Sequence, residues 1–393
     1  MDNASTNLCT RVEKLKPLLI DSIAETESGN RVTDSVACAF RDENLFHTWI
    51  PKSLGGWELS PMEGCLAMEE MATVDSASAW MFQMCNAVSL LAAWFDDECI
   101  EYIFRDGIPM FGDSFAPPMK IGKASNGYNL NGQSSFVSNC QAIDRFIGLA
   151  QLVNDDDSVV LDSAGHAISY IFTVASADFQ VIENWDTVGM RGTGSHDVKI
   201  VNLEIPPYAA AILEPLEKAN NAAYQIPIGP LAIWIGMSSM SALTLGIARS
   251  AYEEFMLLCE SKTPSYFDSK VGEGALTQYR LGEIHAHLNA AKRYLYGTLE
   301  EIWTHVGKGD VMRTEDKRDL AAACAFTTQS ANHMIKLIAE SAGTSIVRES
   351  NALSRRFRDL HTLQQHVFTA RNRYQDIGAL CLGKPPAFGL LGF

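Results

Sequence analysis

The sequence has few charged side chains, and basic ones are the scarcer kind. Charged residues make up 20% of the 393 positions, and 31 Lys and Arg stand against 47 Asp and Glu, a formal net charge of −16 at pH 7. A broad positive surface is therefore missing, which argues against nucleic acid or an anionic membrane as a partner. The hydrophobic share of 47% is that of a globular chain, so disordered and collagen-like classes are excluded. The low charge predicts surface hidden in an oligomer.

Cysteine pairs are missing as well. The nine cysteines are scattered singly, none in a C-x-x-C pair, and their number is odd. This pattern predicts reduced thiols rather than a disulfide framework or a zinc cage. The polar start Met1–Ser5 has no basic-then-apolar export signal. We therefore expect a cytoplasmic protein.

One long stretch carries no charge at all. Residues 219–248 contain no Asp, Glu, Lys or Arg, and 226–247 is long enough to cross a bilayer, which takes about 20 residues. Pro227 and Pro230 lie at its start, several Ser and Thr residues lower its hydrophobicity, and no cluster of basic residues flanks it. We interpret it as a buried helix of a large bundle rather than a membrane span.

The pattern of hydrophobic and turn-forming residues changes at two places along the chain, which predicts three domains. Residues 1–109 read as helices, residues 110–215 as an antiparallel β domain, and residues 216–393 as a four-helix bundle. The fold class is therefore α+β and mainly α. Local signals include a helix N-cap at Ser60, before Pro61 and Glu63, and a hairpin at 128–132. The four long helices are expected at 226–247, near 281–302, at 316–341 before Gly343, and at 358–382.

Common catalytic and metal signatures are absent. The chain has no G-x-S-x-G elbow and no H-E-x-x-H helix, and residues 189–194 have the wrong glycine order for a dinucleotide-binding loop. His285 and His287 are two positions apart, so on a helix their side chains diverge by about 200° and cannot share an ion. We therefore predict no metal site.

Four groups of sequence strings point to one family. They are Ile50–Gly56 with Met68–Trp80, Gly127–Gly132 with Phe136–Cys140 and Ala142–Asp144, Gly189–Val198, and Ala342–Thr344 with Arg355–Asp359. Their content and order resemble the acyl-CoA dehydrogenase superfamily over nearly the whole chain. The resemblance implies an N-terminal helical domain, a middle β domain and a C-terminal four-helix bundle that supports a homotetramer.

The residues expected of a dehydrogenase are missing. Members of that family abstract a proton with a glutamate, which stands either eight residues after the Arg-Asp pair or near the start of the first C-terminal helix. Here the first position is Val367, and 226–247 has no acid. Residues 262–266 also lack the arginine that grips a bound FAD. The chain instead resembles the two-component monooxygenases that use reduced flavin on phenols, indoles and thiophenes.

This resemblance implies a function. The protein would be an oxygenase component that receives reduced FMN or FAD from an NAD(P)H-dependent flavin reductase. With O₂ it would oxygenate a small aromatic or heteroaromatic substrate through a C4a-hydroperoxyflavin, which survives only where water is excluded. Two alternatives stay open: an FAD-dependent acyl-CoA dehydrogenase-like desaturase with an unusual base, and a non-catalytic helical scaffold that lost its flavin.

The same resemblance implies site residues. Ser138 is the expected donor near the flavin N5, and His366 the expected base toward a phenol or N–H substrate, or the group that orients the peroxide. Asn86 is expected to line the substrate side. The predicted flavin contacts are Ser138, Asn139, Arg191, Thr193, Ser195 and Lys262. The competing interpretations are a turn cap for Ser138, a core histidine for His366, a local hydrogen bond for Asn86, core packing for Trp80, and structural roles for Arg358 and Asp359.

Overall fold

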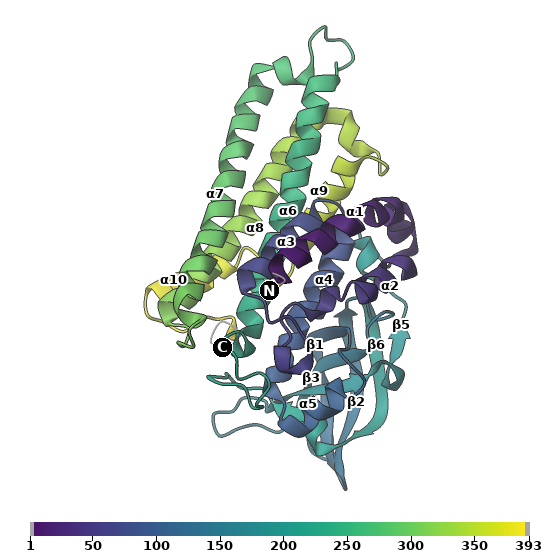
Figure 1. Cartoon of the computed structure of the whole chain (residues 1–393), viewed down its shortest axis with the longest axis vertical. Helices are drawn as coiled ribbons and strands as arrows, with labels where there is room; N and C mark the ends of the chain where they lie inside the picture. The colour runs from purple at the N-terminus through teal and green to yellow at the C-terminus, as the bar shows by residue number, and fades with distance from the viewer. Residues whose placement is uncertain (1–3, 390–393) are drawn as a thin grey trace.

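The N-terminal part is a group of helices between a sheet and a long bundle (Figure 1). The computed structural model describes residues 4–389. The helices are α1 (Ala4–Gly29), α2 (Asp34–Asp42), α3 (Pro61–Ala72), α4 (Ser76–Ser89) and α5 (Asp97–Phe104). The predicted N-cap is confirmed, since Ser60 and Glu63 form a capping box at the start of α3. α4 ends at Ser89, and a buried 3₁₀ turn, Leu90–Trp94, follows it.

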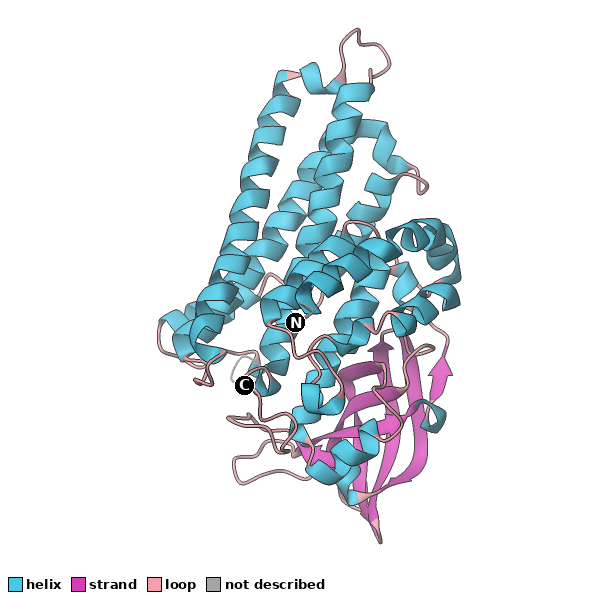
Figure 2. Cartoon of the chain, in the orientation of Figure 1, coloured by secondary structure: helices cyan, strands magenta, loops and turns pink. Residues whose placement is uncertain are grey.

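A seven-stranded sheet packs beneath these helices (Figure 2). Its strands are β1 (Phe111–Ala124), β2 (Gly127–Val137), β3 (Arg145–Val153), β4 (Ser169–Ala175), β5 (Gln180–Ile182), β6 (His196–Ile205) and β7 (Ala210–Ile212), in the order β5-β6-β2-β1-β3-β4-β7. The expectation of a purely antiparallel sheet is wrong, because β1 and β3 are parallel. After the β1–β2 hairpin the chain crosses back through 138–144, so β3 starts where β1 starts.

The predicted hairpin lies at a different place from the expected one. Residues 128–132 belong to β2, and the turn comes just before them, at Ser125 and Asn126. The alternating side chains of this stretch pair with β1 on one side and with β6 on the other, which explains why it extends rather than turns.

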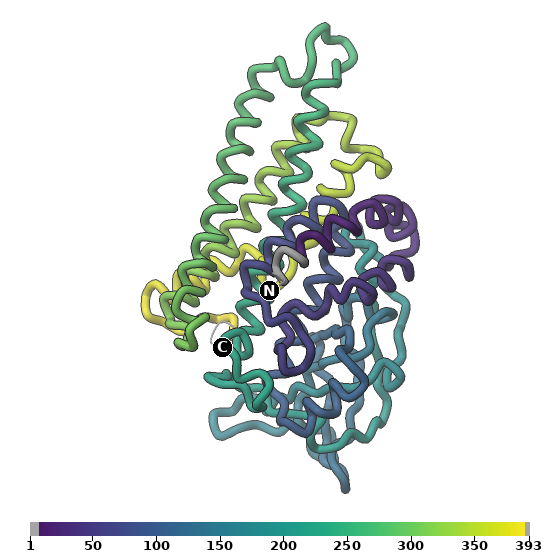
Figure 3. Tube along the Cα trace, in the orientation of Figure 1, coloured from purple at the N-terminus to yellow at the C-terminus, as the bar shows by residue number. Residues whose placement is uncertain are grey.

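The C-terminal part is a bundle of long helices (Figure 3). The long helices are α6 (Ala232–Ser261), α7 (Ala275–Val306) and α8 (Thr314–Ala342), and two short ones follow, α9 (Ala352–Leu363) and α10 (Arg373–Cys381). The prediction of a fourth long helix over 358–382 is wrong, since residues 364–372 form turns between α9 and α10. There the Phe368 N–H donates to His366 Nδ1 and the Thr369 hydroxyl donates to the Leu363 carbonyl, so side chains replace helical bonds.

The uncharged segment is a core helix, as predicted. Within residues 4–389, one helix is long and apolar enough to cross a membrane, Gly229–Ser261, and its most apolar window lies wholly inside the protein. It packs against α3 so closely that a Cβ at Gly246 would lie 2.2 Å from the Glu69 carbonyl. Glu69 also accepts from Lys292 Nζ at 2.9 Å and from the Tyr296 hydroxyl at 2.7 Å. These contacts join the N-terminal helices to the bundle.

Candidate functional site

A chain of hydroxyl groups lies where the sheet meets α4. The indole N–H of Trp80 donates to Ser138 Oγ at 2.8 Å, Ser138 Oγ lies 2.9 Å from Ser195 Oγ, and Ser195 Oγ lies 2.7 Å from Thr193 Oγ1. Thr193 Oγ1 donates in turn to the Met190 carbonyl at 2.9 Å. The structure thus brings together three of the predicted flavin contacts and adds Trp80 to them.

The direction of this chain follows from its two ends. Trp80 can only donate and the Met190 carbonyl can only accept, so the three hydroxyl hydrogens between them point the same way, from Ser138 to Ser195 to Thr193. Ser138 Oγ therefore has no free hydrogen in this arrangement. A donation from Ser138 to a bound group requires either its backbone N–H or release of its bond to Ser195.

Trp80 also touches His366. The two rings meet edge to face, with centroids 5.7 Å apart, and the ring of Phe368 packs against the same imidazole with centroids 5.4 Å apart. One residue of α4 therefore connects the Ser138 chain to the histidine that follows α9. Core packing of Trp80 is confirmed, but its polar contact is a role that the sequence did not reveal.

The environment of His366 keeps its ring neutral. The side chain of His366 is only partly exposed. Surrounding protein desolvates the ring and lowers the pKa of His366 to about 4. Because the Phe368 N–H donates to Nδ1 at 3.2 Å, the hydrogen of the neutral ring is on Nε2. By contrast His361 is exposed and pairs with Gln364.

Asp359 holds the 189–194 loop against this site. Its carboxylate accepts from the Met190 N–H at 2.6 Å and from the Ser76 hydroxyl. The loop approaches α9 so closely that a Cβ on Gly189 would lie 2.1 Å from the Arg358 carbonyl oxygen. Arg358 itself pairs with Glu27 at 3.0 Å. The structural interpretation of Arg358 and Asp359 agrees with these contacts, which join three of the family strings in space.

The remaining predicted flavin contacts, Asn139, Arg191 and Lys262, do not belong to the chain of hydroxyl groups. Asn139 has left-handed backbone geometry, and its buried Nδ2 has no partner among the described residues. Arg191 Nε donates to the Thr187 carbonyl at 3.1 Å, and its guanidinium lies 3.6 Å from Glu349. Lys262 caps α8 by donating to the Ala342 carbonyl at 2.8 Å. Lys262 lies at the start of the α6–α7 loop, at the end of the bundle away from the sheet (Figure 1). Within one chain it therefore lies apart from Ser138.

Asn86 has a structural environment. It is fully buried, its Oδ1 accepts from the Thr48 N–H at 2.9 Å, and both of its amide hydrogens go to carbonyls, those of Leu45 and Phe82. No donor remains for a substrate. This environment does not support the predicted substrate contact and agrees with the local hydrogen bond instead.

Two polar groups on the helix-facing side of the sheet were missed by sequence reasoning. Asp113 of β1 and Thr173 of β4 both stand opposite Ile147 of β3, so the three side chains share one face. Burial raises the pKa of Asp113 to about 7. Thr173 is buried, and its hydroxyl has no partner among the described residues. The available signal for Asp113 was an acid near the start of the segment predicted to be β domain, since Asp is depleted in strands.

A surface pocket of about 380 Å³ lies beside this cluster rather than within it. Its walls include Arg31, Gln141, Trp185 and His196, but none of the predicted site residues. His196 is held there by the backbone N–H groups of Asn184 and Trp185. We place the candidate site at Trp80, Ser138 and His366 because these three side chains are in contact and Asn139, next to Ser138 in the chain, has a buried Nδ2 without a partner among the described residues.

Comparison with known proteins identifies the family. Residues 13–99 match the model of the acyl-CoA dehydrogenase N-terminal domain, and residues 238–371 match that of an acyl-CoA dehydrogenase C-terminal domain. The chain belongs to the acyl-CoA dehydrogenase family. Its relatives are named as a monooxygenase, as the oxygenase component of a hydroxylase and as the oxygenase subunit of a flavin-dependent monooxygenase, which agrees with the branch predicted from the sequence.

Three comparisons give the extent of the likeness. An indole-3-acetate monooxygenase of Acinetobacter baumannii is 25% identical over 350 residues, covering 88% of this chain and 86% of its own length. The oxygenase component of p-hydroxyphenylacetate 3-hydroxylase from the same species is 22% identical, covering 98% and 89%. XiaF from Streptomyces, solved with FADH₂ and glycerol, superposes with a TM-score of 0.88 at 19% identity, covering 98% and 97%. The family's fold is thus shared over the whole chain.

Proposed function

We propose that this flavin-dependent monooxygenase is the oxygenase component of a two-component system. It would take reduced FMN or FAD from a separate NAD(P)H-dependent flavin reductase and oxygenate a small aromatic or heteroaromatic substrate. The observation that carries the proposal is the contact of Trp80 with both Ser138 and His366. The dehydrogenase positions offer no base, since Val367 is an exposed aliphatic residue and α6 begins without an acid.

The residues around this cluster fit a flavin. The buried Nδ2 of Asn139, next to Ser138 in the chain, has no partner among the described residues. Such a group is costly unless something bonds to it, and a flavin ring offers carbonyl and nitrogen acceptors. Ser138, Asn139, Thr193 and Ser195 are the residues that would hold it. Related structures contain FADH₂ in one case and FMN in another, so both forms are candidates here.

His366 would act as a hydrogen-bond donor in this site. A bound reduced flavin supplies the electrons with which one atom of O₂ enters the substrate and the other leaves as water. A neutral imidazole whose Nδ1 already accepts from Phe368 presents an Nε2–H, and a pKa of about 4 makes it a weak base at pH 7. We therefore favour the orienting role over the general-base role. Trp80 and Phe368 cover part of the imidazole, which limits its contact with water.

A desaturase remains the second candidate because of Asp113. A carboxyl group with a pKa of about 7 on the helix-facing side of the sheet has the properties of a general base. This residue would replace the glutamate that acyl-CoA dehydrogenases use. Asp113→Asn would abolish a desaturase but leave an oxygenase able to hydroxylate.

Isotope labelling separates these functions. The purified chain is mixed with a flavin reductase, NADH, FMN or FAD, ¹⁸O₂ and a panel of phenols, indoles and thiophenes. We expect a product that carries one ¹⁸O atom, and we expect His366→Ala to lose most of it while its matched control His361→Ala retains it. Reduction of an electron-acceptor dye by an acyl-CoA, without O₂ and without labelled product, would establish the desaturase instead. No binding of flavin in either redox state would favour the scaffold.

The assembly proposed is a homotetramer in the cytoplasm. Large apolar side chains are exposed to solvent at one end of the bundle. They are Leu257, Phe267, Leu276 and Tyr279, each more than 60% exposed. Such a group of residues is typical of an interface between subunits. Light scattering on a sizing column tests the mass, and a monomer would refute the tetramer. The unpaired cysteines support the location.

A further inference from the structure

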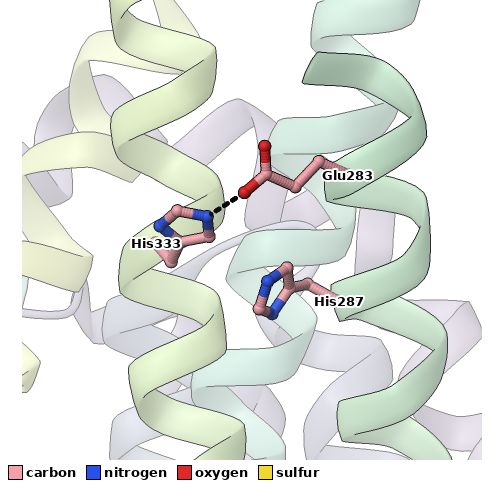
Figure 4. Close-up of side chains that lie close together, drawn as sticks. All are labelled: Glu283, His287 and His333. Atoms are coloured by element: carbon pink, nitrogen blue, oxygen red, sulfur yellow. Dashed lines mark hydrogen bonds and ion pairs between the residues drawn. The ribbon is translucent and has the colours of Figure 1, made fainter. Parts of the chain in front are cut away.

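Three side chains with metal-binding atoms converge between α7 and α8 (Figure 4). Glu283 and His287 are four residues apart on α7, which places them on one face of that helix, and His333 projects toward them from α8. His333 Nε2 lies 2.7 Å from Glu283 Oε1. The imidazole centroids of His287 and His333 are 4.8 Å apart. One ligand atom from each residue lies within 4.8 Å of the other two.

His287 is already oriented by a fourth residue. Its Nδ1 lies 3.3 Å from the Ser330 hydroxyl on α8, so that nitrogen has a hydrogen-bond partner and Nε2 is left for another. Histidines that bind metals are commonly fixed in this way, with one ring nitrogen on the ion and the other on a neighbouring oxygen. Ser330 is one helical turn from His333, so α8 supplies both a ligand and the group that positions another ligand.

We propose that Glu283, His287 and His333 bind a divalent transition-metal ion of the zinc type. Two imidazoles and one carboxylate are a ligand set that Zn²⁺ accepts, with a water molecule in the fourth position. Bonds of 2.0–2.1 Å place tetrahedral ligands roughly 3.3 Å apart, so the three side chains need to draw together by rotation about their χ angles. All three are partly exposed, which gives them that freedom and gives the ion a path from solvent.

The ion would join α7 to α8. Binding replaces the hydrogen bond between His333 and Glu283. The hydrogen on His333 Nε2 passes to solvent, and the neutral ring that holds the ion carries its one hydrogen on Nδ1. None of Trp80, Ser138 and His366 belongs to this cluster, so the site is independent of the flavin chemistry. An ion held by two helices stabilises the folded bundle because the unfolded chain has no such site.

Titration of the metal-free protein with Zn²⁺ tests this site. The full chain is stripped with EDTA, transferred to chelator-free buffer and studied by isothermal titration calorimetry. We expect one ion per chain with a Kd in the micromolar range or tighter. His287→Ala and His333→Ala should each weaken binding more than 100-fold, and Ser330→Ala about 10-fold, in line with the typical effect of losing an outer-sphere partner.

His285 offers a matched control. It lies two residues from His287 on the same helix, is exposed and pairs with Asn289, so His285→Ala should bind Zn²⁺ as the wild type does. Circular dichroism confirms that each variant is folded, and Glu283→Gln replaces any variant that is not. A wild-type Kd weaker than about 100 μM overturns the proposal. So does unchanged binding in both His287→Ala and His333→Ala, or an equal loss in His285→Ala.

Discussion

The burial of His366 makes stability depend on pH in a way that one substitution removes. Surrounding protein lowers the pKa of this imidazole from 6.5 to about 4, so the folded protein holds the ring neutral. The unfolded chain takes up a proton near pH 6.5, whereas the folded protein does so only near pH 4. The contribution of His366 is therefore fully present above pH 6.5 and is lost as the pH falls toward 4.

The size of the effect follows from the two pKa values. At pH 5, protonation stabilises the unfolded chain by about 2 kcal/mol and the folded protein by about 0.1 kcal/mol, so the wild type loses about 2 kcal/mol relative to pH 7.5. This is an upper figure, because His366 keeps an edge in contact with solvent. His366→Gln keeps a polar side chain but does not titrate, so it does not suffer this loss.

Urea unfolding at pH 7.5 and pH 5.0 measures the difference between wild type and variant. Groups other than His366 titrate in both proteins and cancel in that difference. We expect the stability of His366→Gln relative to wild type to rise by up to about 2 kcal/mol at the lower pH. The control His361→Gln shows how much of the pH-dependent change in stability comes from removing any histidine in this segment. A difference that stays constant with pH would refute the burial argument and the neutral imidazole with it.

Three further substitutions test the surroundings of the site. Gly189→Ala places a Cβ 2.1 Å from a backbone oxygen of α9 and should cost about 3 kcal/mol in thermal unfolding, whereas Gly282→Ala, with open space around it, should not destabilise. Trp80→Phe removes the indole donor to Ser138, so we expect a loss of about 1 kcal/mol in urea unfolding; an unchanged midpoint would show that the bond contributes nothing. Asp113→Asn removes a carboxyl whose pKa is raised to about 7 and whose stabilising protonated form is lost as the pH rises from 4 through 7. Between pH 4 and pH 8 the stability of Asp113→Asn relative to wild type should therefore rise by roughly 2 kcal/mol, which is half of what the pKa shift implies because the side chain is partly exposed. A stability difference that does not change with pH would contradict the burial of Asp113.

The local sequence predicted the helices and the family well, but it misplaced several boundaries. The α3 cap was found because a capping box is complete within four residues. The turn before β2 and the break after α9 were missed because neighbours in space decide them. Pairing with β1 and β6 keeps 128–132 extended, and His366 and Thr369 bond to the backbone where a helix was expected.

The candidate site divides in the same way. Ser138 and His366 were predicted because they stand in strings typical of the family, but their common neighbour Trp80 comes from a different string and lies 58 residues from Ser138. Asn86 looked like a substrate contact because a polar residue on an apolar helix is conspicuous in a sequence. Its partners, Leu45 and Thr48, are about 40 residues away and cannot be read from that helix.

The sequence alone determined the fold class, the branch of the family and the absence of a dehydrogenase base, since these depend on local strings and on the charge of single positions. The tertiary structure alone decided which polar groups meet. Trp80, Ser138 and His366 come together from three separate elements, and Glu283 and His287 meet His333 across two helices. Contacts between distant residues depend on packing and register, which no short stretch of chain specifies. Both the proposed flavin site and the proposed metal site arise from such contacts.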